Sequence, residues 1–309
     1  MSKIKMKTEE NLTLQSAFEY FIRRCKVKNL SEESIQSYRY KIKPFIVFYG
    51  EESPINTINK STVDDYVLYL ERESKASDIT INSYLRSLKA FLYYCMEEQG
   101  LFPFKIHLIK TEKKLKETYS DDELKRLLKK PKTSQFSEFK TWAFISYLVG
   151  TGNRISTALN VKVKDISFDE GVIYIRKTKN RKQQIIPLSA SLSSVLSSYL
   201  LIRQGSPEDY LFCSDTGAKG DKRTYQQLVA DYNKKRGINK TSCHLFRHTF
   251  AKKWILSGGD VFRLQKILGH SSITVTKEYL SIFDCDLNKD FDKFNPLDLL
   301  QSDTRIKMK

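Results

Sequence analysis

The second half of the chain holds a set of side chains that together could cleave a phosphodiester bond without a metal ion. The set consists of Arg154, Lys179, His244, Arg247, His270 and Tyr279. A tyrosine hydroxyl can act as the nucleophile, and arginine suits the phosphate because its planar fork donates paired hydrogen bonds and stays charged. A lysine or histidine can protonate the leaving oxygen when cationic neighbours lower its pKa. The set is therefore complete for transfer of a phosphoryl group to tyrosine.

These residues stand in four short segments. The segments are TGNRIS at 151–156, a basic stretch at 176–182, HLFRHTF at 244–250 and LGHSSI at 268–273. Tyr279 follows nine residues after His270. His244 and Arg247 are three residues apart, so they share one face if a helix begins there. Each segment alone also fits an ordinary structural role, and His248 fits packing or hydrogen bonding; the chemistry is favoured because all of them occur together.

Two apolar runs flank the basic stretch and are predicted to form a β-hairpin. Residues 172–175 form one strand and residues 185–188 the other. The tip between them carries the basic residues Arg176, Lys177, Lys179, Arg181 and Lys182. Because such a tip is costly to bury and can meet phosphates, we expect it to contact a DNA backbone. From about residue 190 onward the chain is predicted to be mostly helical.

The first hundred residues or so are predicted to form about four or five helices, because apolar residues recur there at helical spacing. Ser31 can cap the second helix. The longest helix is expected to begin after Ser77. Its buried face would consist of Ile81, Leu85, Leu88 and Leu92. The other side carries Arg86 and Lys89, which fit either a solvated helix surface or contacts with DNA.

The composition changes along the chain in a way that predicts two domains. The length of 309 residues suits this number, at roughly 100–200 residues per domain. The expected parts are a helical domain over 10–110, a lysine-rich linker over 111–119, a second domain over 120–285 and a tail over 286–309. Ser120 and Glu123 form a capping-box pattern where the second domain starts. The expected fold class is mainly α, with a small β-sheet in the second domain.

The chain is strongly basic, with a formal net charge of +17 and a pI near 9.5. Such a charge favours a polyanionic partner, nucleic acid before an anionic membrane surface. The five cysteines are scattered without a C-x-x-C pair, which argues against a zinc site or a disulfide framework. The sequence shows neither the roughly 20 apolar residues of a membrane span nor the apolar core of a signal peptide. We expect a soluble, cytoplasmic protein without a zinc site.

The four segments, taken in order, resemble the tyrosine recombinase, or phage integrase, family. The resemblance lies in TG-x-RIS, the hairpin lysine before IIPLS, H-x-x-RHTFA and LGHSSI-x-x-T-x-x-Y. These motifs extend over residues 119–285, and the first 110 residues look like the helical, SAM-like core-binding domain of the same family. The resemblance implies a mostly helical catalytic domain with a small sheet, which acts on double-stranded DNA at specific sites.

The resemblance also assigns the bond-breaking steps to three residues. Tyr279 would attack the DNA to give a 3′-phosphotyrosine and a free 5′ hydroxyl. Lys179 would protonate the leaving oxygen, and His244 would act as acid or base near the nucleophile. Because the phosphotyrosine keeps the bond energy, no ATP, metal or cofactor would be needed. Reversal of the reaction onto another strand would give recombination.

The scissile phosphate would be held by Arg154, Arg247 and His270 in the same comparison. The family often has an acidic residue three positions after the first arginine, where this chain has Thr157. Such an acid orients neighbouring groups. Threonine at this position therefore affects how the neighbouring catalytic groups are held in place, and not which residues carry out the reaction.

The family works as homo-tetramers on two DNA sites, with or without an accessory protein, and a C-terminal segment usually docks on a neighbouring subunit. In this chain the apolar residues around 297–300 would either dock in that way or fold back on their own domain. The lysine-rich composition favours integration and excision of a mobile element such as a phage or transposon. The alternatives are a Xer-type recombinase that resolves chromosome or plasmid dimers, a type IB topoisomerase and a non-catalytic DNA-binding relative. We expect no additional N-terminal arm-binding domain.

Overall fold

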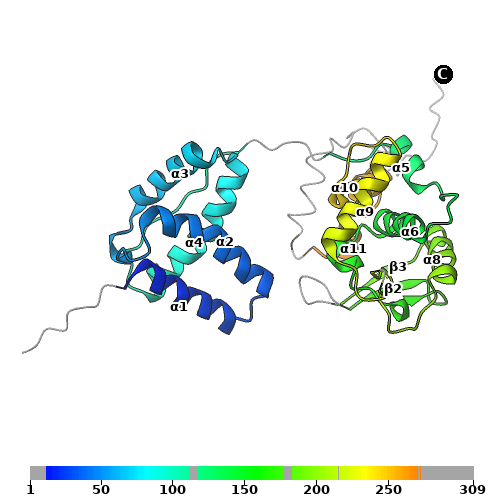
Figure 1. Cartoon of the computed structure of the whole chain (residues 1–309), viewed down its shortest axis with the longest axis horizontal. Helices are drawn as coiled ribbons and strands as arrows, with labels where there is room; N and C mark the ends of the chain where they lie inside the picture. The colour runs from blue at the N-terminus through cyan, green and yellow to red at the C-terminus, as the bar shows by residue number, and fades with distance from the viewer. Residues whose placement is uncertain (1–11, 112–116, 177–182, 215, 271, 273–309) are drawn as a thin grey trace, which may run out of the picture. The chain divides into compact units, whose positions relative to one another are not determined.

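The computed structural model describes residues 12–111, 117–176, 183–214, 216–270 and 272. The chain forms two compact units that divide between Lys114 and Leu115 (Figure 1). Each unit has its own hydrophobic core. The fold is mainly helical with a small three-stranded sheet, which confirms the predicted fold class. Among the described residues, no helix is both long and apolar enough to cross a membrane.

In its described part, the N-terminal unit has four α-helices and one short 3-10 helix. They are α1 (Leu14–Val27), α2 (Glu32–Tyr49), η1 (Ile55–Thr57), α3 (Lys60–Ser74) and α4 (Asp78–Glu98). The side chains of Thr13, Ser31 and Asn59 each accept a hydrogen bond from the backbone N–H three residues later. These contacts satisfy donors that a helix leaves unpaired at its start. The predicted cap at Ser31 is therefore confirmed.

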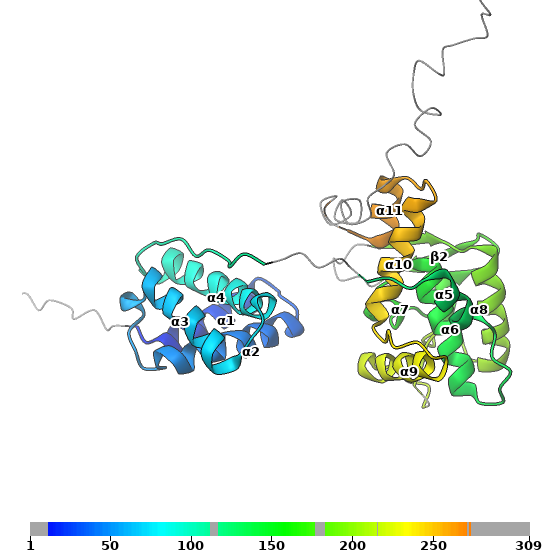
Figure 2. The same cartoon turned by 90° about the horizontal axis from the view of Figure 1, so that it is seen from above.

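Helix α4 packs against α1, α2 and α3, and Figure 2 shows the four helices from a second direction. It begins directly after Ser77, as predicted. The predicted apolar face is buried, with Ile81, Leu85, Leu88 and Leu92 all in the core. Phe91 adds an edge-on contact to Phe18 of α1, with ring centroids 5.5 Å apart. Because this face is committed to the core, the other side of α4 remains for solvent or a partner.

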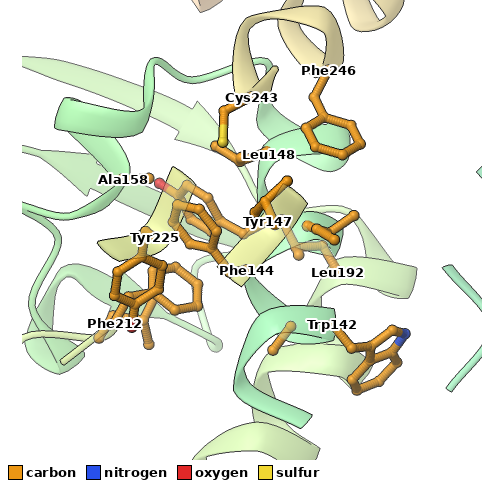
Figure 3. Packing of buried hydrophobic residues seen from close by; sticks show 14 of the residues in the cluster. Trp142, Phe144, Tyr147, Leu148, Ala158, Leu192, Phe212, Tyr225, Cys243 and Phe246 are labelled. Atoms are coloured by element: carbon orange, nitrogen blue, oxygen red, sulfur yellow. The ribbon is translucent and has the colours of Figure 1, made fainter. Parts of the chain in front are cut away.

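In its described part, the C-terminal unit has seven α-helices, a 3-10 helix and the sheet. They are α5 (Asp121–Leu128), α6 (Phe136–Thr151), α7 (Ile155–Ala158), η2 (Val163–Asp165), β1 (Ile166–Ser167), β2 (Val172–Ile175), β3 (Gln184–Pro187), α8 (Ala190–Arg203), α9 (Lys222–Lys235), α10 (Cys243–Leu256) and α11 (Val261–Leu268). Helix α6 packs against α5, α8, α9 and α10. Its residues Phe144 and Tyr147 lie edge-on to Phe212 in the core, with centroids 4.9 and 5.4 Å apart (Figure 3).

The sheet is antiparallel, with strand order β1-β2-β3. Strands β2 and β3 form the predicted hairpin, with Tyr174 opposite Ile185. The sequence does not predict β1, because a strand of two residues is too short to show the alternation of apolar and polar positions. Strand β3 also contacts α11, so the hairpin is fastened to the helical part of the unit.

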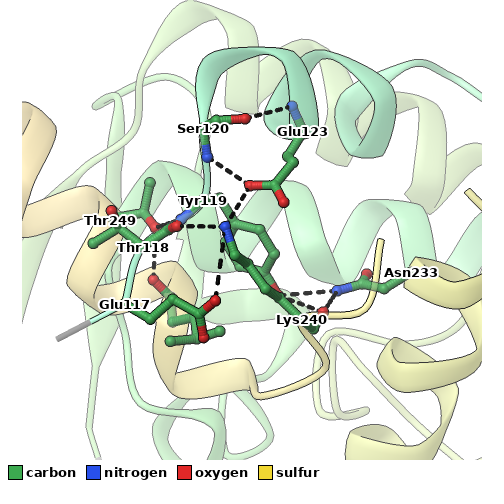
Figure 4. Close-up of polar contacts among 9 residues, drawn as sticks. Glu117, Thr118, Tyr119, Ser120, Glu123, Asn233, Lys240 and Thr249 are labelled. Carbon is green, nitrogen blue, oxygen red and sulfur yellow. Dashed lines mark hydrogen bonds and ion pairs between the residues drawn. The ribbon is translucent and has the colours of Figure 1, made fainter. Parts of the chain in front are cut away.

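The C-terminal unit begins earlier than the sequence predicts, because the last residues of the expected linker belong to its core (Figure 4). The ring of Tyr119 stacks on Phe246 of α10 at 4.6 Å. Its backbone N–H donates to Thr249 Oγ1 at 2.9 Å, and its hydroxyl accepts a hydrogen bond from Asn233 Nδ2 at 2.9 Å. Lys240 then joins the same strip to α5 by a 2.8 Å contact with Glu123. The linker therefore ends before Tyr119, earlier than the predicted end at residue 119.

Candidate active site

Arg247 brings three of the predicted segments together. It lies in α10, one turn after the helix starts at Cys243, and its side chain is buried. Nη1 donates a hydrogen bond to the carbonyl oxygen of Gly152 at 3.0 Å, and Nη2 donates to that of Leu268 at 2.8 Å. Nη2 also lies 2.6 Å from Nε2 of His270. The ends of α6 and α11 are thereby tied to α10.

These contacts explain how the protein tolerates a buried guanidinium. A buried charge is costly unless hydrogen bonds replace its water. The two carbonyl oxygens offset part of this cost for Arg247, and the imidazole adds a third contact. Because arginine has no acceptor, Nε2 of His270 accepts in this contact, and a neutral ring then carries its proton on Nδ1. The result is a fixed positive group beside a histidine, an arrangement suited to an anion such as a phosphate.

Arg154 stands at the start of α7, two residues after Gly152. It is half-buried, and the residue before it is locked in place. Asn153 donates from Nδ2 to the hydroxyl of Tyr147 at 2.9 Å, and its backbone N–H donates to Thr151 Oγ1 at 3.2 Å. The turn that carries Arg154 is thus fixed to α6 by buried hydrogen bonds. The motif TG-x-RIS leaves position 153 open to any residue; the role of Asn153 depends on a tyrosine six residues earlier, in α6.

Thr157 occupies the position where the family often has an acid. Its side chain is buried, and its backbone N–H donates to the carbonyl oxygen of Arg154 at 2.9 Å. An ionised carboxylate at this depth would need its own donors. A threonine has no charge that needs such donors, and Arg247 is held instead by backbone carbonyls, among them that of Gly152.

His244 lies in the first turn of α10 and is exposed, whereas Arg247 is buried. The predicted helix start is confirmed, and Ser242 caps it by accepting the N–H of His244 at 3.3 Å. The imidazole of His244 lies 5.1 Å from the ring of His248, one turn further along. The two histidines therefore form an edge-on pair, with His248 half-buried. His244 is thus accessible to solvent, as a proton-transfer group needs to be.

The structure places Arg176 at the base of the hairpin and gives it a structural partner. Its Nε donates to Oδ1 of Asp165 at 2.6 Å, and Oδ2 of the same carboxylate accepts the N–H of Lys162 at 2.9 Å. Asp165 is buried, so the pair holds the end of β2 against η2. Sequence reasoning missed Asp165, because nothing in its own spacing marks it. The remaining candidates Lys177, Lys179, Arg181, Lys182 and Tyr279 lie outside the described residues.

The two candidates on α4 differ in the structure. Arg86 is exposed, as a DNA-contacting residue would be. Lys89 is half-buried; its Nζ donates to the carbonyl oxygen of Ile106 at 3.2 Å and lies 5.1 Å from the centre of the Tyr93 ring. Lys89 thus has partners within its own unit, and Arg86 is the better candidate for a contact with DNA.

Residues 12–111, 117–176, 183–214, 216–270 and 272 contain no cluster of three or more His, Cys, Asp or Glu residues that could hold a metal ion. The four cysteines among them are free thiols in the core: Cys25, Cys95, Cys213 and Cys243. Burial raises the pKa of the Cys95 and Cys243 thiols to about 12. These two thiols are therefore protonated at neutral pH and are poor nucleophiles.

Comparison with curated proteins gives a consistent result. The chain is 27% identical over 277 residues to a tyrosine recombinase of Pseudothermotoga lettingae, which covers 88% of this chain and 94% of that protein. It is 28% identical over 282 residues to the tyrosine recombinase XerA of Pyrococcus horikoshii, a match that covers 90% of this chain and 93% of that protein. Both likenesses extend across the two units.

Solved structures and family profiles agree with these relatives. A crystal structure of XerA recombinase is 26% identical, with a TM-score of 0.51 and 91% and 98% of the two chains covered. The Tn1549 transposon integrase, solved in complex with transposon right end DNA, shares the fold with a TM-score of 0.74 at 22% identity. This match covers 86% of this chain and 94% of the integrase chain. Residues 18–99 match the N-terminal SAM-like domain of phage integrases, and residues 117–284 match the phage integrase family itself. This chain therefore belongs to the phage integrase family, the tyrosine recombinases.

Proposed function

We propose that this chain is a site-specific recombinase that cuts and rejoins double-stranded DNA through a 3′-phosphotyrosine at Tyr279. The observation that carries the proposal is the buried contact between Arg247 and His270, beside the turn that bears Arg154. Such a fixed, cationic cluster stabilises the charge that develops on a phosphate under attack. The solved complexes of the Tn1549 integrase with DNA support DNA as the partner.

The proposed reaction uses each residue in a defined step. The oxygen of Tyr279 attacks phosphorus while the bond from phosphorus to the 5′ oxygen breaks. Arg154, Arg247 and His270 hold the non-bridging oxygens, and the 5′ oxygen takes a proton from Lys179. His244 accepts the proton of the tyrosine hydroxyl. The reverse steps, with the 5′ hydroxyl of another strand as nucleophile, rejoin the DNA without loss of bond energy, because one phosphate ester replaces another.

The biological role that we propose is integration and excision of a mobile element. The strongly basic composition and the shared fold with a transposon integrase support this role. Resolution of chromosome or plasmid dimers is the second candidate, favoured by the relatives named XerA and XerD. The two roles differ in their DNA sites. Recombination between the ends of an element would support the first, whereas recombination between two copies of one chromosomal or plasmid site would support the second.

Assembly is proposed as a homo-tetramer on two DNA sites, with the apolar group at residues 297–300 coupling neighbouring subunits. A chain without residues 294–309 should then bind one site as before but lose tetramer assembly and recombination. Native gel shifts with one-site and two-site DNA would separate the two effects. Unchanged assembly of the shortened chain would rule this coupling out.

The proposal is tested with nicked suicide substrates that carry candidate sites from the element or chromosome of origin. Wild type and Tyr279→Phe are incubated with each substrate in the absence of divalent metal. We expect a covalent protein–DNA band for wild type that disappears in the variant, and its position gives the cleavage site. Specific binding and assembly without any band would instead indicate a DNA-binding relative that has lost catalysis. Relaxation of supercoiled DNA without a specific site would indicate a topoisomerase.

A further inference from the structure

Gln184 joins the β2–β3 hairpin to the end of α11. It is the first residue of β3, and its side-chain Nε2 donates to the carbonyl oxygens of Lys266 and Ile267, the latter at 2.6 Å. Both carbonyls lie in the last turn of α11, where the regular hydrogen-bond ladder of the helix ends; that of Lys266 also accepts the backbone N–H of Gly269 at 3.1 Å. Gln184 therefore caps this helix from a strand that lies 82 residues earlier than Lys266.

The turn after α11 is shaped to receive this side chain. Gly269 ends the helix in the left-handed region, with φ of +62°, a conformation that glycine adopts without a steric penalty. A Cβ atom at this position would lie 2.9 Å from Oε1 of Gln184. The absence of a side chain at Gly269 thus lets the amide of Gln184 lie close against the turn.

The same turn contains His270 and contacts Arg247, the two proposed phosphate ligands. Three consecutive carbonyl oxygens at the end of α11 accept hydrogen bonds from side chains of other elements. The carbonyl oxygens of Lys266 and Ile267 accept hydrogen bonds from the side chain of Gln184. The carbonyl oxygen of Leu268 accepts one from Arg247 at 2.8 Å. After one glycine, His270 contacts Arg247 again at 2.6 Å. A shift of this turn therefore moves two of the three contacts of Arg247 together, those with Leu268 and His270.

We infer that Gln184 is a positioning residue that holds the end of α11, and through it the contact between Arg247 and His270. The inference rests on the proposed role of these two residues as ligands of the scissile phosphate. Gln184 acts through them and not on the DNA. Displacements of about 1 Å in such a site can cost about 100-fold in rate, so the cap matters for catalysis.

Two variants remove the cap in different ways, and a third serves as the matched control. Gln184→Glu keeps the shape but directs a carboxylate at two carbonyl oxygens, and Gln184→Met removes the donor without adding charge. Gln183→Glu adds the same charge at the neighbouring, exposed residue. Circular dichroism confirms that each variant is folded. Loss of fold in both Gln184 variants would overturn a role specific to the Arg247–His270 contact.

The first measurement is the imidazole spectrum of the free protein by 1H–15N NMR. The chain has four histidines, and a His270→Gln variant assigns the signal of His270. We expect this signal to move in both Gln184 variants and to stay in place in Gln183→Glu. The second measurement is the rate of covalent complex formation at saturating protein on the suicide substrate. It should fall by up to about 100-fold in the Gln184 variants, with DNA affinity unchanged.

The two measurements separate the inference from the proposed function. An unmoved His270 signal would overturn the inference and leave the proposed function standing. A moved signal with a normal cleavage rate would overturn the claim that the cap matters for catalysis, and it would leave the proposed roles of Arg247 and His270 standing, because a contact can shift without being lost. If Gln183→Glu changed the His270 signal and the cleavage rate as much as the Gln184 variants do, the cause would be surface charge, and the inference would also be overturned.

Discussion

Nη1 of Arg247 donates a hydrogen bond to the carbonyl oxygen of Gly152 at 3.0 Å, across 95 residues of sequence. Arg154 follows Gly152 by two residues, so this bond sets where the first arginine lies relative to the second. A phosphate clamp needs both guanidinium groups at fixed separation, because rearrangement during the reaction would add to the barrier. The contact therefore makes Gly152 part of the support of the proposed site.

We expect Gly152→Ala to destabilise the C-terminal unit more than Gly171→Ala. Both glycines have φ of +63°, which costs a residue with a side chain about 1–2 kcal/mol. At Gly152 the added Cβ would also lie 2.6 Å from Cδ1 of Phe250, whereas at Gly171 it meets nothing within 4 Å. Overpacking of this kind adds about 1–3 kcal/mol.

The measurement is urea unfolding followed by tryptophan fluorescence. The chain has two tryptophans, Trp142 and Trp254, and both lie in the C-terminal unit. Fluorescence thus reports the free energy of unfolding of that unit. Equal losses in the two glycine variants would contradict the role of the close contact with Phe250.

Replacement of Arg247 by lysine should slow DNA cleavage while site binding persists. A lysine keeps the charge but lacks the planar fork, so it cannot reproduce the bonds to both Gly152 and Leu268. We expect a loss on the order of 100- to 1,000-fold in the rate of covalent complex formation, the usual cost of one donor to a developing charge. Arg263→Lys, on the exposed side of α11, is the matched control and should cleave normally. A normal rate for Arg247→Lys would show that charge alone is enough.

Asp165→Asn should loosen the base of the hairpin. The buried carboxylate accepts from Arg176 and from the N–H of Lys162, and an amide can satisfy both donors less well. Because more than half of the Arg176 side chain is exposed, solvent screens part of the interaction. We expect a loss of about 1–3 kcal/mol in the free energy of unfolding. Asp169→Asn, at an exposed site in the same connection, should change it little; similar losses in both would count against the pair.

Acid should weaken the contact between Glu123 and Lys240 that fastens the start of the unit. Partial burial by itself raises the pKa of Glu123, but hydrogen bonds from Lys240 and Ser120 outweigh it and hold the pKa below its usual value. A carboxyl group with a depressed pKa stabilises the fold above its unfolded pKa of about 4.3, and this stabilisation disappears as the pH falls through the folded pKa.

Glu123→Gln should therefore be less stable than wild type by about 1 kcal/mol at neutral pH, since it loses a charged cap and ion pair. The difference should shrink below about pH 4, where wild type also loses the charge. Urea unfolding by tryptophan fluorescence at both pH values checks this. Asp122→Asn removes a mostly exposed carboxylate of the same helical turn and should have little effect. A difference that stays constant with pH would contradict the assignment.

Local features of the fold could be predicted from the sequence because they depend on residues close together in the chain. The caps at Ser31 and Ser120 each involve an N–H three residues later, so the pattern is visible without a structure. The buried face of α4 repeats with the period of the helix, and β2 and β3 stand out as apolar runs around a basic tip. The order of the motif segments was enough to predict the family.

The support of the candidate site was decided by tertiary structure. Arg247 is held by the carbonyl oxygens of Gly152 and Leu268, and α11 is capped by Gln184. A backbone carbonyl is present in every residue, so no residue type marks the one that will accept a distant hydrogen bond. The sequence by itself therefore determined which side chains are available for the chemistry and in what order they occur. Packing between elements far apart in the chain decided which backbone groups hold them in place.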